Sequence, residues 1–229
     1  MGDKFSRLVK MIGQDKLDII KKKTVLVIGC GGVGGYVIES LVRSGIGRII
    51  IVDYDVIEQS NINRQIIALD STIGRKKVDA LEERIKDINH EVEVIKIDMF
   101  IDDSNIDELF NNDIDYVVDA CDTISTKLLI IKKSIEKNIK FISCMGTGNR
   151  LDPTKLGIVD IRKTNNDPLA RVMRKLVKDN KINNRIPVLC STELPIKVSD
   201  HTPGSSAFVP ASAGLIISSH IIREIINEE

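Results

Sequence analysis

The stretch Thr24-Val-Leu-Val-Ile-Gly-Cys-Gly-Gly-Val-Gly34 joins a short apolar run to a turn rich in glycine. Residues 24–29 are apolar or β-branched, a composition that suits a strand buried on both faces of a parallel sheet. Residues 33–44 then show helical spacing and are followed by Gly45, a common helix stop. A strand, a glycine turn and a helix in this order are typical of a unit that binds nucleotide phosphates at the start of the helix.

The rest of the chain continues to alternate strands and helices. Further strands are expected at residues 48–53, 92–97, 116–119, 141–144 and 155–161. Helices are expected at 76–89, 104–110 (with Ser104 as N-cap), 125–137, 168–178 and 212–226. Residues 179–206, rich in Asn, Pro and Ser, are expected to form a long loop. This alternation predicts a Rossmann-like, doubly wound α/β sheet with a closing C-terminal helix.

The composition is that of a globular chain with one domain. It has 229 residues, and its 33 Lys+Arg balance 33 Asp+Glu. Residues 1–23 hold no apolar block, and the apolar stretch 208–222 is interrupted by Pro210 and His220, so the sequence predicts no membrane helix and a cytoplasmic location. No two of the four cysteines form a CxxC pair, which excludes the usual closed zinc clusters; the four are Cys30, Cys121, Cys144 and Cys190.

The glycine turn and the end of the second strand form the first part of a candidate nucleotide site. Glycine lets phosphate approach the backbone closely, and the turn contains Gly29, Gly31, Gly32 and Gly34. Asp53 ends the second strand, about 20 residues further on, where an acid can bind ribose hydroxyls. These residues alone leave NAD and ATP equally open.

The polar segment that follows favours ATP. It contains Asp55, Asn61 and Arg64, and Lys77 follows at the start of the helix expected at 76–89. Two cations directed at the glycine turn suit a triphosphate better than a pyrophosphate that a helix end already neutralises. Each could be a solvated surface charge when considered alone, but their joint occurrence in this order favours a site. The acids of Asp119-Ala-Cys-Asp122, at the end of a strand, are placed to hold Mg²⁺ bridging the phosphates.

These motifs in this order resemble the adenylating domain of the ubiquitin-activating enzymes and their bacterial relatives. The resemblance covers about residues 5–150 and implies that the four glycines, Asp53 and Asp55 hold ATP. It implies that Asn61, Arg64 and Lys77 contact the phosphates and that Asp122 holds magnesium. It also implies a homodimer in which Arg7, in Phe5-Ser-Arg-Leu, reaches the partner subunit's ATP.

Residues 151–229 are expected to form the half of the chain that binds the substrate. Their motifs point to one branch of this family. Sulfur-carrier activators usually carry two CxxC zinc pairs, which this chain lacks. The stretches 151–154, 167–170, 190–193 and 204–210 are similar to those of the tRNA threonylcarbamoyladenosine dehydratases. The resemblance implies ATP-dependent dehydration of a modified adenosine in tRNA through adenylation of its carboxylate. The alternatives are activation of a small sulfur-carrier protein and a nucleotide-binding regulator or NAD-binding domain without this chemistry.

Residues 162–197 contain nine lysines and arginines against three acids. Such an excess suits contact with RNA phosphates, although charge alone fits a solvated helix and loop equally well. Cys190 is expected in a loop over the active site, either as an accessory thiol or as an ordinary buried residue. A monovalent cation near the C-terminal loops and a sulfur-transfer protein as partner are left open.

Overall fold

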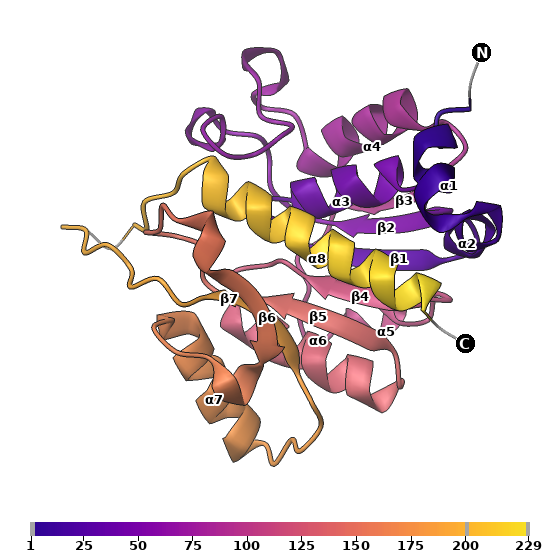
Figure 1. The fold of residues 1–229 in the computed structure, drawn as a ribbon. Helices are drawn as coiled ribbons and strands as arrows, with labels where there is room; N and C mark the ends of the chain where they lie inside the picture. Colours follow the sequence, from indigo (N-terminus) through magenta and orange to yellow (C-terminus); the bar gives the residue numbers. More distant parts are fainter. Residues whose placement is uncertain (1–2, 200–201, 228–229) are drawn as a thin grey trace.

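The computed structural model describes residues 3–199 and 202–227, and helices cover both faces of one seven-stranded sheet (Figure 1). The strand order is β3-β2-β1-β4-β5-β7-β6, and only β6 runs antiparallel to its neighbour. The strands are β1 (Thr24–Ile28), β2 (Arg48–Val52), β3 (Glu93–Ile97), β4 (Tyr116–Asp119), β5 (Lys140–Cys144), β6 (Leu156–Asp160) and β7 (Pro187–Ser191). The doubly wound sheet predicted from the sequence is confirmed.

Each face of the sheet is covered by its own helices (Figure 1). Those on one face are α3 (Gly34–Arg43), α4 (Lys77–Ile88) and α8 (Phe208–Ile226), and those on the other are α5 (Ile106–Leu109), α6 (Ile124–Glu136) and α7 (Pro168–Asp179). The N-terminal helices α1 (Ser6–Ile12) and α2 (Gln14–Ile20), which the sequence patterns did not predict, lie beside the amino ends of the strands. The central strands β1 and β4 are buried along their whole length, because both faces are covered.

Two local predictions were wrong. Residues 179–206 are not all loop, because 187–191 form β7 between β5 and β6. The apolar part of β7 is only Val-Leu-Cys, so the strand is specified by its partners in the sheet rather than by a local pattern. Ser104 is not an N-cap: α5 begins at Ile106, and the Ser104 hydroxyl donates to Asp102 over 2.6 Å.

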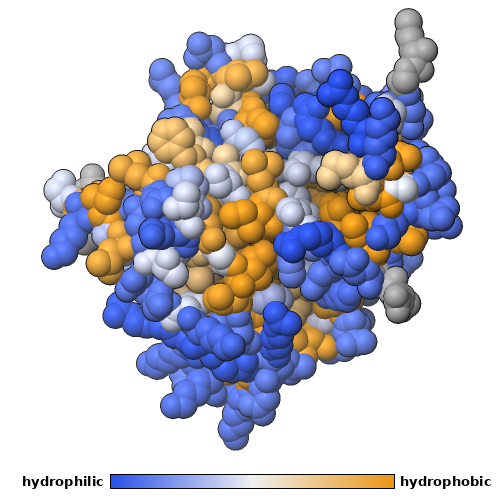
Figure 2. Space-filling model, in the orientation of Figure 1, coloured by the Kyte–Doolittle hydropathy of each residue, from blue (hydrophilic) through white to orange (hydrophobic). Residues whose placement is uncertain are grey.

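Helix α8 is 19 residues long and apolar enough, by length and composition alone, to cross a membrane. In the structure it lies along α3, and eight of its residues are buried. Gly214 makes this close packing feasible, because an added Cβ would lie 2.6 Å from the Val33 carbonyl oxygen. Figure 2 shows apolar side chains along α8 on the outer face, where Phe208 and Leu215 are exposed. Packing within the fold therefore accounts for the buried side of this apolar helix.

Candidate nucleotide site

A pocket of about 600 Å³ opens at the carboxyl ends of β1, β2, β4 and β5. This edge is where open α/β sheets bind their ligands. Nine of the residues singled out in the sequence line the pocket: Gly29, Gly31, Gly32, Asp53, Asp55, Asn61, Arg64, Lys77 and Asp122. Residues 144–148 and 202–205 complete its wall on the side of the second half of the chain. The fold therefore brings the predicted motifs together at one place.

The glycines of the turn are required by the backbone itself. Gly29 has φ +91°, and a Cβ on it would lie 2.6 Å from the Ala120 carbonyl oxygen. A Cβ on Gly34 would lie 1.8 Å from the Gly29 carbonyl oxygen, so Gly34 closes the turn although it does not line the pocket. No side chain caps the N-terminus of α3. The Gly35 and Tyr36 amides there donate to the Gly31 and Val33 carbonyls, so the positive dipole end of the helix, rather than a full set of free N–H groups, can receive an anion.

Asp53 fixes the shape of the turn. One of its carboxylate oxygens accepts a hydrogen bond from the Cys30 amide over 2.7 Å, and the other accepts from the Asp55 amide over 2.9 Å. The carboxylate is buried at the pocket wall. Burial, and next the charge of Asp53, raise the pKa of the Cys30 thiol, so Cys30 stays protonated. Cys30 therefore acts as a structural residue of the turn.

Lys77 and Arg64 approach the glycine turn from the predicted segments. The Lys77 ammonium lies 2.6 Å from an Asp55 carboxylate oxygen and 3.8 Å from one of Asp53, and only 6% of the Lys77 side chain is exposed. The Arg64 side chain lies over the turn, because a Cβ on Gly32 would be 3.4 Å from its Cγ. A guanidinium and an ammonium at this place supply cations that phosphates can contact, beside the carboxylates of Asp53, Asp55, Glu58 and Asp122 that also line the pocket.

The two acids after β4 have different environments. Asp119 is fully buried and forms an ion pair with the Lys127 ammonium, whose nitrogen lies 3.0 Å away, and it also accepts from the Ser143 hydroxyl. Asp119 is therefore committed to the core, and the sequence-based suggestion that it helps to hold a metal is wrong. Asp122 is exposed and lines the pocket, and it accepts a long hydrogen bond of 3.5 Å from the Thr123 hydroxyl.

Lys127 is an important residue that the sequence patterns did not reveal. It lies in the first half of α6 with no exposed surface, and its ammonium also donates to the Cys144 carbonyl over 2.7 Å. Burial, the largest single cause, lowers its pKa, but the charges of Asp119, Cys121 and Cys144 and the hydrogen bond to Asp119 together raise the pKa overall. Lys127 thus joins the ends of β4 and β5, which carry two parts of the pocket wall. Nothing in its sequence neighbourhood distinguishes it from a surface lysine.

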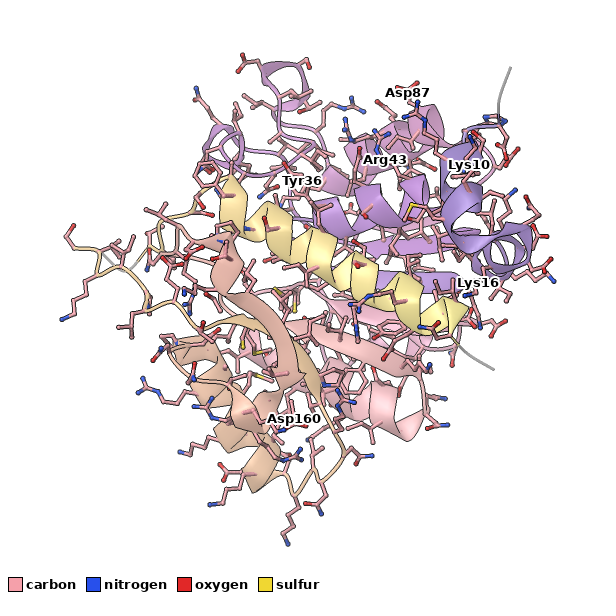
Figure 3. All side chains as sticks on the ribbon, in the orientation of Figure 1. Lys10, Lys16, Tyr36, Arg43, Asp87 and Asp160 are labelled. Carbon is pink, nitrogen blue, oxygen red and sulfur yellow. The ribbon has the colours of Figure 1, made fainter. Side chains whose placement is uncertain are left out.

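Arg7 and Cys190 lie outside the pocket of this chain. Arg7 is exposed on α1, the helix that carries Lys10 in Figure 3, beside the amino ends of the strands. Its predicted role concerns the partner's pocket. The expectation that Cys190 lies in a loop over the site is wrong, because it belongs to β7 and is 5% exposed. Burial raises the pKa of its thiol, which disfavours the reactive thiolate.

The basic segment also divides into two groups. The Arg162 guanidinium donates a hydrogen bond of 3.0 Å to the Asp160 carboxylate and further hydrogen bonds to two backbone carbonyls. Figure 3 labels Asp160 beside α7. Arg174 is half-buried and donates to the Thr164 carbonyl over 2.8 Å. These two arginines therefore serve the fold. The exposed cations of α7 are Arg171, Lys175 and Lys178, at spacings that place them on one face of the helix.

Comparison with known proteins decides the family. The model of the ThiF family matches residues 5–227, nearly the whole chain. The chain belongs to the ThiF family.

Two relatives match over nearly the whole chain. A tRNA threonylcarbamoyladenosine dehydratase of Bacillus subtilis is 40% identical and aligns with 100% of this chain and 96% of its own. The crystal structure of E. coli tRNA N6-threonylcarbamoyladenosine dehydratase in complex with ATP superimposes with a TM-score of 0.93 and 30% identity, covering 97% of this chain and 93% of that one. The same enzyme in complex with AMP also gives a TM-score of 0.93.

A relative named for the alternative function matches less of the chain. The sulfur carrier protein ThiS adenylyltransferase of Bacillus subtilis is 32% identical, but the alignment covers 64% of this chain and 45% of the relative. The alignment with this relative therefore leaves about a third of the chain unmatched, whereas the dehydratases match nearly all of it.

Proposed function

We propose that this ThiF-family protein is an enzyme that uses ATP to dehydrate, and thereby cyclise, N6-threonylcarbamoyladenosine in tRNA. The observation that carries the proposal is the similarity to dehydratases along nearly the whole chain, whereas the alignment with the ThiS adenylyltransferase covers 64% of it. The pocket supports it, because a glycine turn, Arg64 and Lys77 converge where ATP would place its phosphates.

The reaction needs an activated carboxylate because hydroxide is a poor leaving group. A carboxylate oxygen of the threonyl group attacks the α-phosphorus of ATP, forming a mixed anhydride and releasing pyrophosphate. A nitrogen of the same substrate then attacks the carbonyl carbon, loses its proton and expels AMP as a five-membered ring closes. Attack within one molecule has a large proximity advantage, so the enzyme needs no nucleophile of its own.

The protein's contribution is to bind, orient and stabilise charge. Arg64 and Lys77 would stabilise the negative charge that develops at the α-phosphate, together with the positive dipole end of α3. Asn61 is buried, and its carbonyl oxygen accepts from the Glu58 amide over 3.1 Å. This contact holds the segment that ends in Arg64. These roles agree with the position of each side chain in the pocket.

Magnesium belongs to the proposal through Asp122. Among residues 3–199 and 202–227, no three His, Cys, Asp or Glu side chains form a group that could hold a metal ion. An exposed carboxylate in the pocket nevertheless fits magnesium, which is commonly bound by one or two carboxylates together with substrate phosphates. The ion would neutralise phosphate charge there. Replacement of Asp122 by Ala should raise the magnesium concentration needed for half-maximal activity, and an unchanged requirement would remove Asp122 from this role.

The tRNA would contact the exposed face of α7. Asp167 caps this helix by accepting from the Ala170 amide over 3.0 Å, and Leu169 in its first turn lines the pocket. The exposed cations therefore extend away from the pocket wall along a helix: Arg171, Lys175 and Lys178. Cations at such spacings can contact successive phosphates while the modified nucleoside enters the pocket.

A homodimer remains part of the proposal, with Arg7 acting in the partner's pocket. The exposed apolar side chains on α8, including Phe208 and Leu215, suit contact with a second copy. Sedimentation of the purified chain tests this, and a monomer at micromolar concentration with full activity would contradict it. A single domain, a cytoplasmic location and a sulfur-transfer partner remain predictions from the sequence, which fractionation and affinity capture would test.

The experiment that tests the proposed activity is pyrophosphate release by the purified protein. We expect release only when ATP and tRNA carrying the threonylcarbamoyl group are both present, with one AMP formed per cyclic nucleoside. The alternative, activation of a sulfur-carrier protein, predicts release with such a carrier and none with tRNA.

A further inference from the structure

The carboxamide of Asn63 bridges two parts of the pocket wall. Its oxygen accepts a hydrogen bond from an Arg64 guanidinium nitrogen over 2.9 Å. Its nitrogen donates to the Ser205 carbonyl oxygen over 3.0 Å. Arg64 and Ser205 both line the pocket, whereas Asn63 itself does not. The two segments are 142 residues apart in sequence, yet lie side by side where the chain enters α8 (Figure 1).

The segment 202–206 is held from the opposite side as well. The Gly204 amide donates to the Asn149 side-chain oxygen over 2.6 Å, and the Asn149 amide donates to the Gly204 carbonyl over 2.8 Å. Asn149 adopts a left-handed backbone with φ 58°, which asparagine tolerates better than most residues. Asparagines from two different loops thus fix one short segment, Asn149 on one side and Asn63 on the other.

The same segment continues to the glycine turn. Pro210, in the first turn of α8, is so close to Gly32 that an added Cβ there would lie 3.2 Å from the Pro210 Cβ. The Arg64 side chain passes over the same glycine. Arg64 is therefore enclosed between the turn that receives phosphate and the segment that leads into α8. Its remaining hydrogen bond, from the nitrogen that also contacts Asn63, goes to the Ser60 carbonyl over 2.9 Å.

We propose that Asn63 is a positioning residue that orients the Arg64 guanidinium toward ATP by anchoring it to the segment 202–206. A carboxamide suits this role because it accepts from the guanidinium and donates to a carbonyl at the same time. A carboxylate at this position would keep the first bond and lose the second. An alanine would lose both, leaving the Arg64 guanidinium with its bond to the Ser60 carbonyl and removing one of the contacts that hold the segment 202–206.

The test compares Asn63→Ala with Asn63→Asp. Asn112→Asp is the control, because the Asn112 side chain also donates to a carbonyl, that of Leu109, over 2.9 Å, but away from the pocket. We expect both Asn63 variants to increase the rate of amide hydrogen exchange in a peptide covering 202–206 by about tenfold. This is the largest change that the loss of one ordinary hydrogen bond would cause. We expect kcat to fall by about tenfold in Asn63→Ala and by less in Asn63→Asp, with KM for tRNA unchanged in both. The control should change none of these quantities.

The inference rests on the proposed function only for the kcat measurement. Exchange of 202–206, and the effect of ATP on it, can be measured even if the protein proves not to be a dehydratase. A wild-type exchange rate in Asn63→Ala would overturn the anchoring of 202–206. Wild-type kcat in an Asn63→Ala protein with raised exchange would overturn the orientation of Arg64. A fall in kcat matched by the Asn112→Asp control would show a general structural effect and likewise overturn it.

Discussion

The Lys77 ammonium lies 2.6 Å from an Asp55 carboxylate oxygen, at the wall of the pocket and almost out of contact with water. Asp55, which is 47% exposed, holds the ammonium in place before any nucleotide arrives. Phosphate oxygens would then meet a cation that is already oriented. Such preorganised charge is the main source of stabilisation in reactions that develop negative charge.

Replacement of Lys77 by Ala should therefore lower kcat by about 10²- to 10³-fold, the loss typical of one preorganised donor. Lys76→Ala is the matched control, because the neighbouring ammonium is exposed and pairs with Asp98 at the surface. Its kcat should stay within about twofold of wild type, since surface ion pairs contribute little. Steady-state AMP formation measures both variants, and equal rates in the two would contradict the assignment of Lys77.

The buried pair of Lys127 and Asp119 should make a large contribution to stability when only one partner is removed. Lys127→Met leaves the Asp119 charge uncompensated in the core, and we expect a loss of about 3–5 kcal/mol in the free energy of unfolding. The double variant that adds Asp119→Asn removes the unpaired charge and should recover much of this loss. Urea denaturation tests both, and a double variant no more stable than Lys127→Met would argue against uncompensated charge as the cause.

The exposed face of α7 should govern tRNA affinity. Simultaneous replacement of Arg171, Lys175 and Lys178 by Glu should weaken binding strongly at low salt and reduce the salt dependence of binding. The control replaces Lys10, Lys16 and Lys22 by Glu, which changes the charge equally near the amino ends of the strands. Filter binding over a range of salt concentrations measures both. If the two triple variants lost tRNA affinity equally, the loss would come from net charge alone, and this result would contradict a tRNA-binding site on α7.

The thiols should not take part in the reaction. Burial raises the pKa of Cys144 to about 12 and also raises that of Cys190, so neither forms much thiolate near neutral pH. Cys190→Ala should retain wild-type kcat, and the native protein should react slowly with iodoacetamide at pH 8. Mass spectrometry of the alkylated protein measures this. Rapid labelling of Cys190, together with loss of activity in Cys190→Ala, would contradict this prediction and support Cys190 as an accessory thiol.

The sequence was most informative where structure is set by neighbouring residues. The strand, turn and helix around Gly29–Gly34 follow from a local pattern, because the turn geometry itself requires the glycines. Strand β7 could not be predicted, because three apolar residues become a strand only when β5 and β6 lie beside them. Lys127 was missed for a similar reason. Whether a lysine is buried depends on a carboxylate that only the folded sheet brings to it.

The site shows the same division between local and long-range information. Motif order predicted which side chains from the first half line the pocket, since parallel strands bring their carboxyl ends to one edge. The bonds of Asn63 to Ser205 and of Asn149 to Gly204 join segments far apart in sequence. No spacing rule reports such contacts, and they became visible only in the three-dimensional structure.

The most direct test of the central claim is mass spectrometry of tRNA nucleosides from cells that lack this protein. Mild hydrolysis must be used so that the cyclic nucleoside survives. We predict that these cells contain only uncyclised threonylcarbamoyladenosine, that the wild-type chain restores the cyclic form and that the Lys77→Ala chain does not. An unchanged amount of cyclic nucleoside in cells without the protein would contradict the account.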